Sequence, residues 1–140
     1  MTLKIVGNKF TDHRSVVVED IYMTNALAGV LGAAYNLTSD RWTLAATTEA
    51  IDAICIKAST GDTDVFGTME LVKPGDIIEG DCTGTVDAAF LKGLRVGVLD
   101  ATGLLIDVAT VSGGHLVVLS HDTANAKARV MPTQNFGHAH

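Results

Sequence analysis

The sequence predicts an all-β protein, mainly antiparallel, folded as a compact β-barrel or β-sandwich with at most one short helix and an N-terminal arm. Three observations lead to this prediction. About nine short apolar runs follow one another at roughly 8–12-residue spacing. Turn-forming Gly, Pro, Asp and Asn residues separate the runs. No amphipathic helices alternate with them, which excludes a βαβ arrangement.

Residues 1–14 (MTLKIVGNKFTDHR) contain a short apolar stub followed by a polar, turn-prone piece. Such a terminus is either a peripheral strand or an arm that is ordered only against a partner, and we assign it as an N-terminal arm. Residues 15–19 (SVVVE) are rich in β-branched side chains and predict a strand.

The segment 20–35 (DIYMTNALAGVLGAAY) is ambiguous. Gly29 and Gly32 oppose a helix, because each costs about 1 kcal/mol relative to Ala in a helix interior. We therefore expect a short helix or an irregular crossing loop. The apolar residues at helical spacing that favour the helix are Met23, Leu27, Val30, Leu31 and Ala34.

Residues 36–40 (NLTSD) predict a turn, and residues 41–47 and 51–58 predict strands. In the second of these strands, alternation places Ile54 and Ile56 on one face and Cys55 and Lys57 on the other. Residues 65–110 then hold the densest series of apolar runs. Turn residues at 73–76 (KPGD), 79–81 (EGD) and 100–103 (DATG) divide it, which predicts consecutive strands of a meander or barrel.

Residues 112–114 (SGG) predict a hairpin turn between strands at 104–110 and 115–120. A further turn at 121–125 leads to a last strand at 126–131, which Pro132 ends. We expect three parts: an arm at 1–14, one β-rich domain at 15–132, and a polar C-terminal tail at 133–140. A chain of 140 residues is large enough for one such domain to bury about two-thirds of its unfolded surface.

Composition excludes several classes of protein. The net charge is −6 and the Lys and Arg residues form no cluster, so we expect no nucleic-acid partner. No apolar run approaches the ~20 residues of a membrane helix, and the N-terminus lacks a signal-peptide core, so we expect no membrane partner and synthesis in the cytoplasm. Cys55 and Cys82 have no CxxC spacing, which favours two buried thiols.

No residue pattern in the chain indicates catalysis, and we expect no enzyme, no cofactor and no metal. His115 and His121 flank one predicted strand and would share a face about 20 Å apart, too far to hold one ion. His138 and His140 form a terminal HxH, which could chelate a metal adventitiously. GxSxG, GxGxxG and DxDxDG patterns are absent, and Asp in the predicted turns is explained by its bonds to its own backbone.

Residues 72–81 (VKPGDIIEGD) look like the turn of barrel-sandwich modules such as the biotinyl and lipoyl carriers. Those carriers present a modifiable Lys on a tight hairpin. Lys73 stands instead before a Pro-Gly turn, so the match is to a generic β-turn and a carrier role is not favoured.

The layout of the whole chain resembles a different family. Residues 8–14 (NKFTDHR) lead to SVVV and an Ala/Gly-rich crossing. Residues 90–122 (FLKGLRVGVLDATGLLIDVATVSGGHLVVLSHD) follow in the second half. Together these resemble the small β-rich capsid decoration, or cement, proteins of tailed bacteriophages. The similarity lies in length, Gly/Ala/Val/Asp-rich composition and a reaching N-terminal segment, and no short motif carries it.

The resemblance implies a structural virion protein on the capsid exterior. Its partner would be the major capsid protein, whose neighbouring subunits it would hold together, often as a homotrimer at three-fold positions. On this basis we expect that deleting residues 1–14 leaves a folded protein that no longer binds heads, whereas loss of folding would identify the stub as a core strand. The residues expected to contact capsid or a neighbouring subunit are Leu3, Ile5, Val6, Lys9, Phe10, Arg14, Tyr22, Met23 and Leu27.

Two alternatives remain open. One is a small β-sandwich module that binds a ligand or acts as a carrier, which a deep apolar pocket or a covalent cofactor would favour. The other is a metal-dependent β-barrel enzyme that uses His115, His121 and nearby Asp residues, which stoichiometric metal would favour.

Overall fold

The computed structural model describes residues 3–9, 17–23, 31–37, 42–45, 51–57, 65–83, 95–96, 103–107 and 115–132. Within these ranges the chain is all-β and mainly antiparallel, and it contains no helix, which confirms the predicted fold class. No helix in the described ranges is therefore long and apolar enough to cross a membrane. The strands are β1 (Lys4–Asn8), β2 (Val17–Met23), β3 (Ala34–Leu37), β4 (Trp42–Leu44), β5 (Ala53–Lys57), β6 (Val65–Leu71), β7 (Asp76–Asp81), β8 (Arg95–Val96), β9 (Leu116–Asp122) and β10 (Lys127–Pro132).

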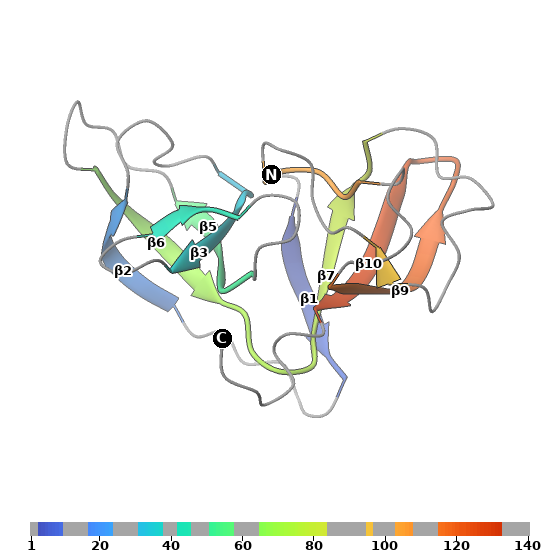
Figure 1. The fold of residues 1–140 in the computed structure, drawn as a ribbon, viewed down its shortest axis with the longest axis horizontal. Coiled ribbons are helices and arrows are strands. Elements are labelled where there is room, and N and C mark those ends of the chain that lie inside the picture. The colour runs from blue at the N-terminus through green and yellow to red at the C-terminus, as the bar shows by residue number, and fades with distance from the viewer. Residues whose placement is uncertain are drawn as a thin grey trace.

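The strands form two sheets that lie side by side (Figure 1). The first has five strands in the order β1-β7-β10-β9-β8, all antiparallel neighbours. The second has the strand order β2-β4-β3-β5-β6. Because β6 also pairs with β2, the strands of this sheet form a closed ring of pairings. One parallel pair, Met23 with Trp42, makes the join between β2 and β4, so the second sheet closes at a single point.

The segment 73–76 switches the chain between the two sheets. Gly75 has a φ of 86° and the amide of Asp76 donates to the carbonyl of Lys73 at 3.0 Å, the geometry of a type II turn with Pro74 in its preferred position. The strand before this turn, β6, pairs with β2 and β5, whereas β7 pairs with β1 and β10. The prediction of a continuous meander is therefore wrong at this turn, because the same turn chemistry serves a hairpin and a crossover equally.

Other predicted boundaries also need correction. Residues 20–23 and 34–35, expected in a short helix or loop, belong to β2 and β3, and residues 36–37, expected in a turn, continue β3. Residues 79–81, expected in a turn, are the second half of β7. At residues 80–81, pairing with β10 overrides the turn preference of Gly and Asp.

The predicted hairpin of residues 104–110 with 115–120 is also wrong in its described part. Ile106 makes an isolated parallel bridge with Cys82, and its amide donates to the carbonyl of Asp81 at 2.9 Å. The strand β9 pairs instead with β8 and β10. Residues 108–114 and the C-terminal tail at 133–140 lie outside the described ranges.

One hydrophobic core joins the two sheets. Ile78, Val118 and Val130 come from the first sheet, and Ala34 and Ile54 come from the second; all five belong to one cluster of buried residues. Because the sheets share this cluster, the described strands form a single β-rich unit.

A smaller buried cluster lies within the second sheet. Ala53 and Cys55 of β5 belong to it, whereas Ile54 between them belongs to the shared core. The predicted alternation of Ile54 and Cys55 is confirmed up to a bulge at Ile56, and β5 is buried on both sides.

Residues 3–9 of the N-terminal segment are part of the fold and not an arm. β1 pairs with β7 over Lys4–Asn8, with one extra residue, Val6, between the paired Ile5 and Gly7. Leu3 has no exposed surface and lies in the shared core, and its amide donates to the carbonyl of Gly32 at 3.1 Å. The prediction of an arm outside the strand ladder is therefore wrong for residues 3–9.

The β9–β10 hairpin contains the one non-glycine residue of the described ranges with a positive φ, Ala126 at 51°. Ala126 ends the turn, and its carbonyl accepts a hydrogen bond from the amide of Cys82 at 2.8 Å. A left-handed conformation costs an L-residue roughly 1–2 kcal/mol. Gly would avoid this steric cost, but it would lose more backbone entropy on folding, so only part of the cost would be recovered.

We predict that Ala126→Gly raises the free energy of unfolding by about 0.5–1 kcal/mol, measured by urea denaturation. Ala124→Gly is the matched control, since Ala124 is an exposed residue of the same turn with an ordinary φ. It should be neutral or destabilising. Equal destabilisation by both substitutions would contradict the explanation.

Candidate interaction surface

The structure divides the residues predicted to contact a partner. Leu3 is fully buried and Ile5 packs against the core, so the prediction that Leu3 contacts a partner is wrong in this fold. Val6 is 37% exposed and Lys9 is exposed, which leaves both available. Tyr22 and Met23 lie in β2, where their backbones pair with Phe66 and Val65 of β6. Phe10, Arg14 and Leu27 lie outside the described residues.

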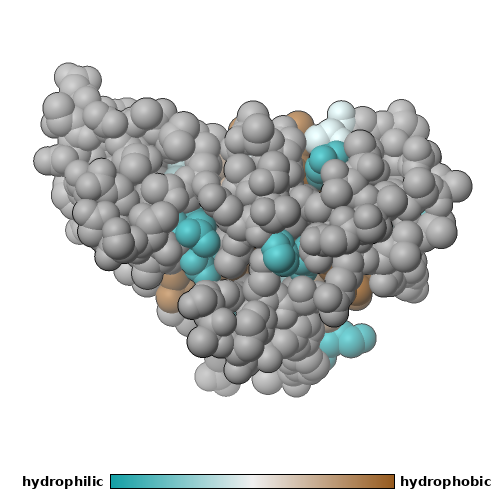
Figure 2. All heavy atoms as spheres, viewed as in Figure 1, coloured by the Kyte–Doolittle hydropathy of each residue, from teal (hydrophilic) through white to brown (hydrophobic). Residues whose placement is uncertain are grey.

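Large apolar side chains that remain exposed are few among the described residues: Val6, Val17 and Leu31. On the face seen in Figure 2, the described residues show small, separate brown and teal areas and no continuous brown one. The described surface therefore offers no broad apolar patch in this view.

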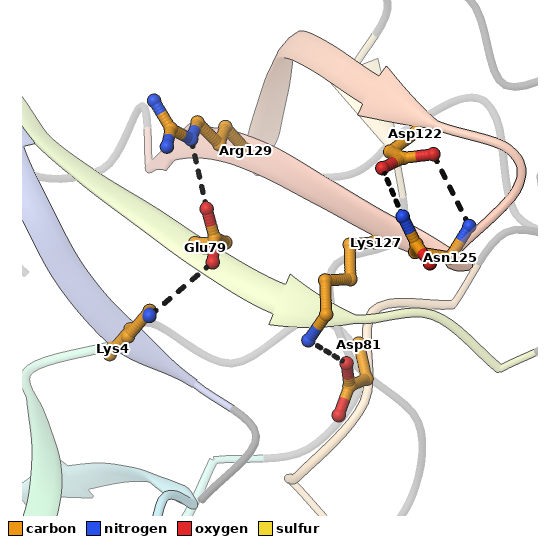
Figure 3. A network of polar contacts seen from close by, with 7 residues as sticks. All are labelled: Lys4, Glu79, Asp81, Asp122, Asn125, Lys127 and Arg129. Atoms are coloured by element: carbon orange, nitrogen blue, oxygen red, sulfur yellow. Dashed lines mark hydrogen bonds and ion pairs between the residues drawn. The ribbon is translucent and has the colours of Figure 1, made fainter.

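Charged side chains gather instead on the outer face of the first sheet (Figure 3). Two rows cross its strands. In one row Lys4 of β1, Glu79 of β7 and Arg129 of β10 are register partners, and in the other Asp81, Lys127 and Asp122 are register partners across β7, β10 and β9. We call this surface the striped face; its members are Lys4, Glu79, Asp81, Asp122, Lys127 and Arg129.

Glu79 is the centre of the first row. Its Oε2 accepts a hydrogen bond from Arg129 Nε at 3.0 Å, and its Oε1 lies 3.5 Å from Lys4 Nζ. The hydrogen bond from Arg129, with the nearby charge of Lys4, lowers the pKa of Glu79 below its usual value. The pairs therefore support folding above the ordinary pKa of a Glu, and this support is lost as the pH falls through the lowered pKa.

Lys127 is the centre of the second row. Its Nζ donates to Asp81 Oδ1 at 2.7 Å, and this hydrogen bond raises the pKa of Lys127. Asp122, at the start of the turn, accepts from the amide of Asn125 at 3.2 Å and from its Nδ2 at 2.7 Å. These bonds lower the pKa of Asp122, so the second row alternates in charge as the first does.

A shallow, open hollow of about 210 Å³ lies over β9 and β10 on the striped face itself, and four of the six residues of that face line it. Charged and polar side chains line it, among them His121, Ser120 and Arg129. A small-molecule site of the usual kind is larger and mostly apolar, so this hollow does not favour the ligand-binding alternative.

The histidines and cysteines of the described ranges do not assemble a metal site. No group of three or more His, Cys, Asp or Glu residues that could hold an ion occurs there. A bulge at Leu119 interrupts the alternation of β9, so the prediction that His115 and His121 share a face is wrong. His13, His138 and His140 lie outside the described residues.

Cys55 and Cys82 are both free and buried, as predicted. Burial, with a smaller contribution from the charge of Asp81, raises the pKa of Cys82 to about 11, and burial also raises the pKa of Cys55. Both thiols therefore stay protonated near neutral pH, and neither is a reactive nucleophile there.

The striped face was missed at the level of sequence, although a signal for it was present. Glu79 and Asp81 stand two residues apart, as do Lys127 and Arg129, and in each case a small uncharged residue, Gly80 or Ala128, stands between them. Such alternation indicates a strand with one charged face.

Comparison of the chain with protein-family models and with curated proteins finds no match.

Proposed function

We propose that this chain is a structural virion protein that binds the outer surface of an icosahedral phage capsid and stabilises contacts between major capsid subunits. The observation that carries the proposal is the layout of the sequence, which resembles phage decoration proteins over most of its length. An all-β unit in which two sheets share one core is compatible with it, because such a role needs a rigid scaffold.

The proposed partner is the major capsid protein, and the proposed oligomer is a homotrimer on the three-fold positions of the shell. Matching symmetry would let three modest contacts act together, and linked weak contacts gain avidity. The protein would be made in the host cytoplasm and function on the virion exterior.

Val6 and Lys9 are the described residues at which the proposed N-terminal contact can be tested. Both are exposed, one in the bulge of β1 and one directly after this strand. A side chain on this edge can meet a capsid subunit without any change to the core, unlike Leu3.

The experiment is co-sedimentation of untagged protein with expanded heads of the phage that encodes it. We expect wild-type protein to pellet with expanded heads, and Lys9→Glu together with Val6→Asp to weaken binding at least about tenfold, or about 1.4 kcal/mol. Lys57→Glu, an exposed charge reversal in β5 of the other sheet, is the control and should bind normally. Failure of the wild-type protein to pellet at any excess would contradict the proposed function.

A further inference from the structure

The sign of the charge on the striped face alternates from strand to strand. Lys4 makes β1 positive, Glu79 and Asp81 make β7 negative, and β10 is positive through Lys127 and Arg129. Asp122 makes the end of β9 negative. The face therefore consists of four parallel stripes in the order plus, minus, plus, minus, with three charges of each sign (Figure 3).

The striped face is open to solvent. The exposed fractions of its side chains are 57% for Lys4, 54% for Arg129, 47% for Lys127 and 40% for Asp81, and the more covered Glu79 retains 20%. The whole chain carries a net charge of −6, yet this face is balanced. Two copies of the chain repel each other less here than over the rest of their surface.

A balanced, striped surface selects its partner by pattern. A uniformly basic or acidic partner meets as many repulsive as attractive charges on it. A partner is favoured only when its own stripes have the opposite order, because like charges brought together oppose binding.

The same face of a second copy has that opposite order. Two copies can stack with their striped faces toward each other, related by a two-fold axis that lies between the faces. When this axis runs parallel to the strands and midway between β7 and β10, β7 of each copy faces β10 of the other. The same axis places β1 of each copy opposite β9 of the other. Glu79 then faces Arg129 of the second copy, Asp81 faces its Lys127, and each contact occurs twice, as in any isologous interface.

We propose that the striped face is a salt-sensitive two-fold interface between two copies of this chain. The proposal does not rest on the proposed capsid function, and a three-fold association would use other surfaces. Exposed ion pairs contribute little individually, so this association is weak and depends on several pairs acting together. Screening by salt reduces it further.

The first measurement is the mass of the untagged protein by sedimentation velocity at low salt, about 20 mM, and at high salt, about 500 mM. We expect a concentration-dependent species at low salt with twice the mass of the high-salt species. The same mass at both salt concentrations, up to the highest soluble protein concentration, would overturn the proposal.

Charge reversal distinguishes this interface from other routes to self-association. Glu79→Arg leaves only positive charge in the first row, and Arg129→Glu leaves negative charge at both position 79 and position 129 of that row. Each variant alone should lose the low-salt doubling, with association weakened at least about tenfold. Lys57→Glu is the control for a change in net charge away from the face, and it should still double.

Mixing the two charge-reversed variants is the decisive experiment. In a mixed pair, the new Arg of the Glu79→Arg copy faces the new Glu of the Arg129→Glu copy. The native Arg129 of the first copy faces the native Glu79 of the second, so both contacts are again attractive. We expect the equimolar mixture to recover the doubled species, while urea denaturation shows that each variant is folded by itself. A mixture that stays at the mass of the separate variants overturns the two-fold interface, whatever the wild-type protein does.

Discussion

Replacing Leu3 with Ala is expected to lower the free energy of unfolding by about 2–5 kcal/mol, because the side chain is fully buried in the core that both sheets share. The loss is a large part of the roughly 5–15 kcal/mol that holds a typical domain folded. Deleting residues 1–9 should have a greater effect, since it also removes β1 from the edge of β7. We therefore expect that deletion to abolish cooperative unfolding, contrary to the expectation from sequence that residues 1–14 are dispensable for folding.

Urea denaturation followed by far-UV circular dichroism measures both changes. Val6→Ala is the matched control in the same segment, because Val6 is 37% exposed and sits in the bulge of β1. It should lower the free energy of unfolding by less than about 1 kcal/mol. Similar small losses for Leu3→Ala and Val6→Ala would show that the N-terminal segment is not anchored in the core.

Replacing Asp76 with Ala is the second change with a large expected effect. The side chain is fully buried, and its two oxygens accept hydrogen bonds from Asn8 Nδ2 at 2.9 Å and from the amide of Lys73 at 2.8 Å. The carboxyl group thus holds the sheet-switching turn closed and ties the end of β1 to it. Its removal leaves these two part-buried donors without this acceptor, and we expect the free energy of unfolding to fall by about 1–3 kcal/mol or more. The free energy of unfolding of Asp76→Asn should lie between those of the wild type and Asp76→Ala, since the amide retains one acceptor oxygen.

Asp122 is the matched control for Asp76. It accepts hydrogen bonds from the same kinds of donor, a backbone amide and an Asn side chain, but it is exposed. Water can replace the lost bonds there, so Asp122→Ala should cost much less than Asp76→Ala in the same urea experiment. Equal losses for the two variants would mean that burial of Asp76 adds nothing to its role.

Much of the secondary structure follows from local patterns. β5, β6, β9 and β10 lie where apolar runs predict strands, and the Thr123–Ala126 turn lies close to its predicted position. Each of these segments has its own signal, from β-branched residues, alternation or flanking turn residues. The all-β class was predictable for the same reason.

The pairing of the strands was not predictable from such signals. Turn chemistry at Pro74 and Gly75 defines a reversal of the chain, but it does not say whether the next strand joins the same sheet. Leu3 is buried in the same cluster as Ile78 and Val130, which are more than seventy residues away in sequence. A short apolar stub therefore has the same local pattern as an arm, and only the distant partners make it part of the core.

The striped face also depends on such long-range pairing. The charges of 79–81 and 127–129 alternate with buried residues, but register alone brings Glu79 beside Lys4 and Arg129. An unpaired segment with Gly80 between two acids is typical of a turn. Backbone pairing with β1 on one side and β10 on the other makes it a strand.

Capsid decoration is tested by the number of copies that a purified expanded head binds at saturation. We expect saturable binding to a fixed number of sites that matches the three-fold positions of the shell, with no binding to unexpanded heads. Absence of binding to expanded heads, or uptake that rises without saturation, would contradict it.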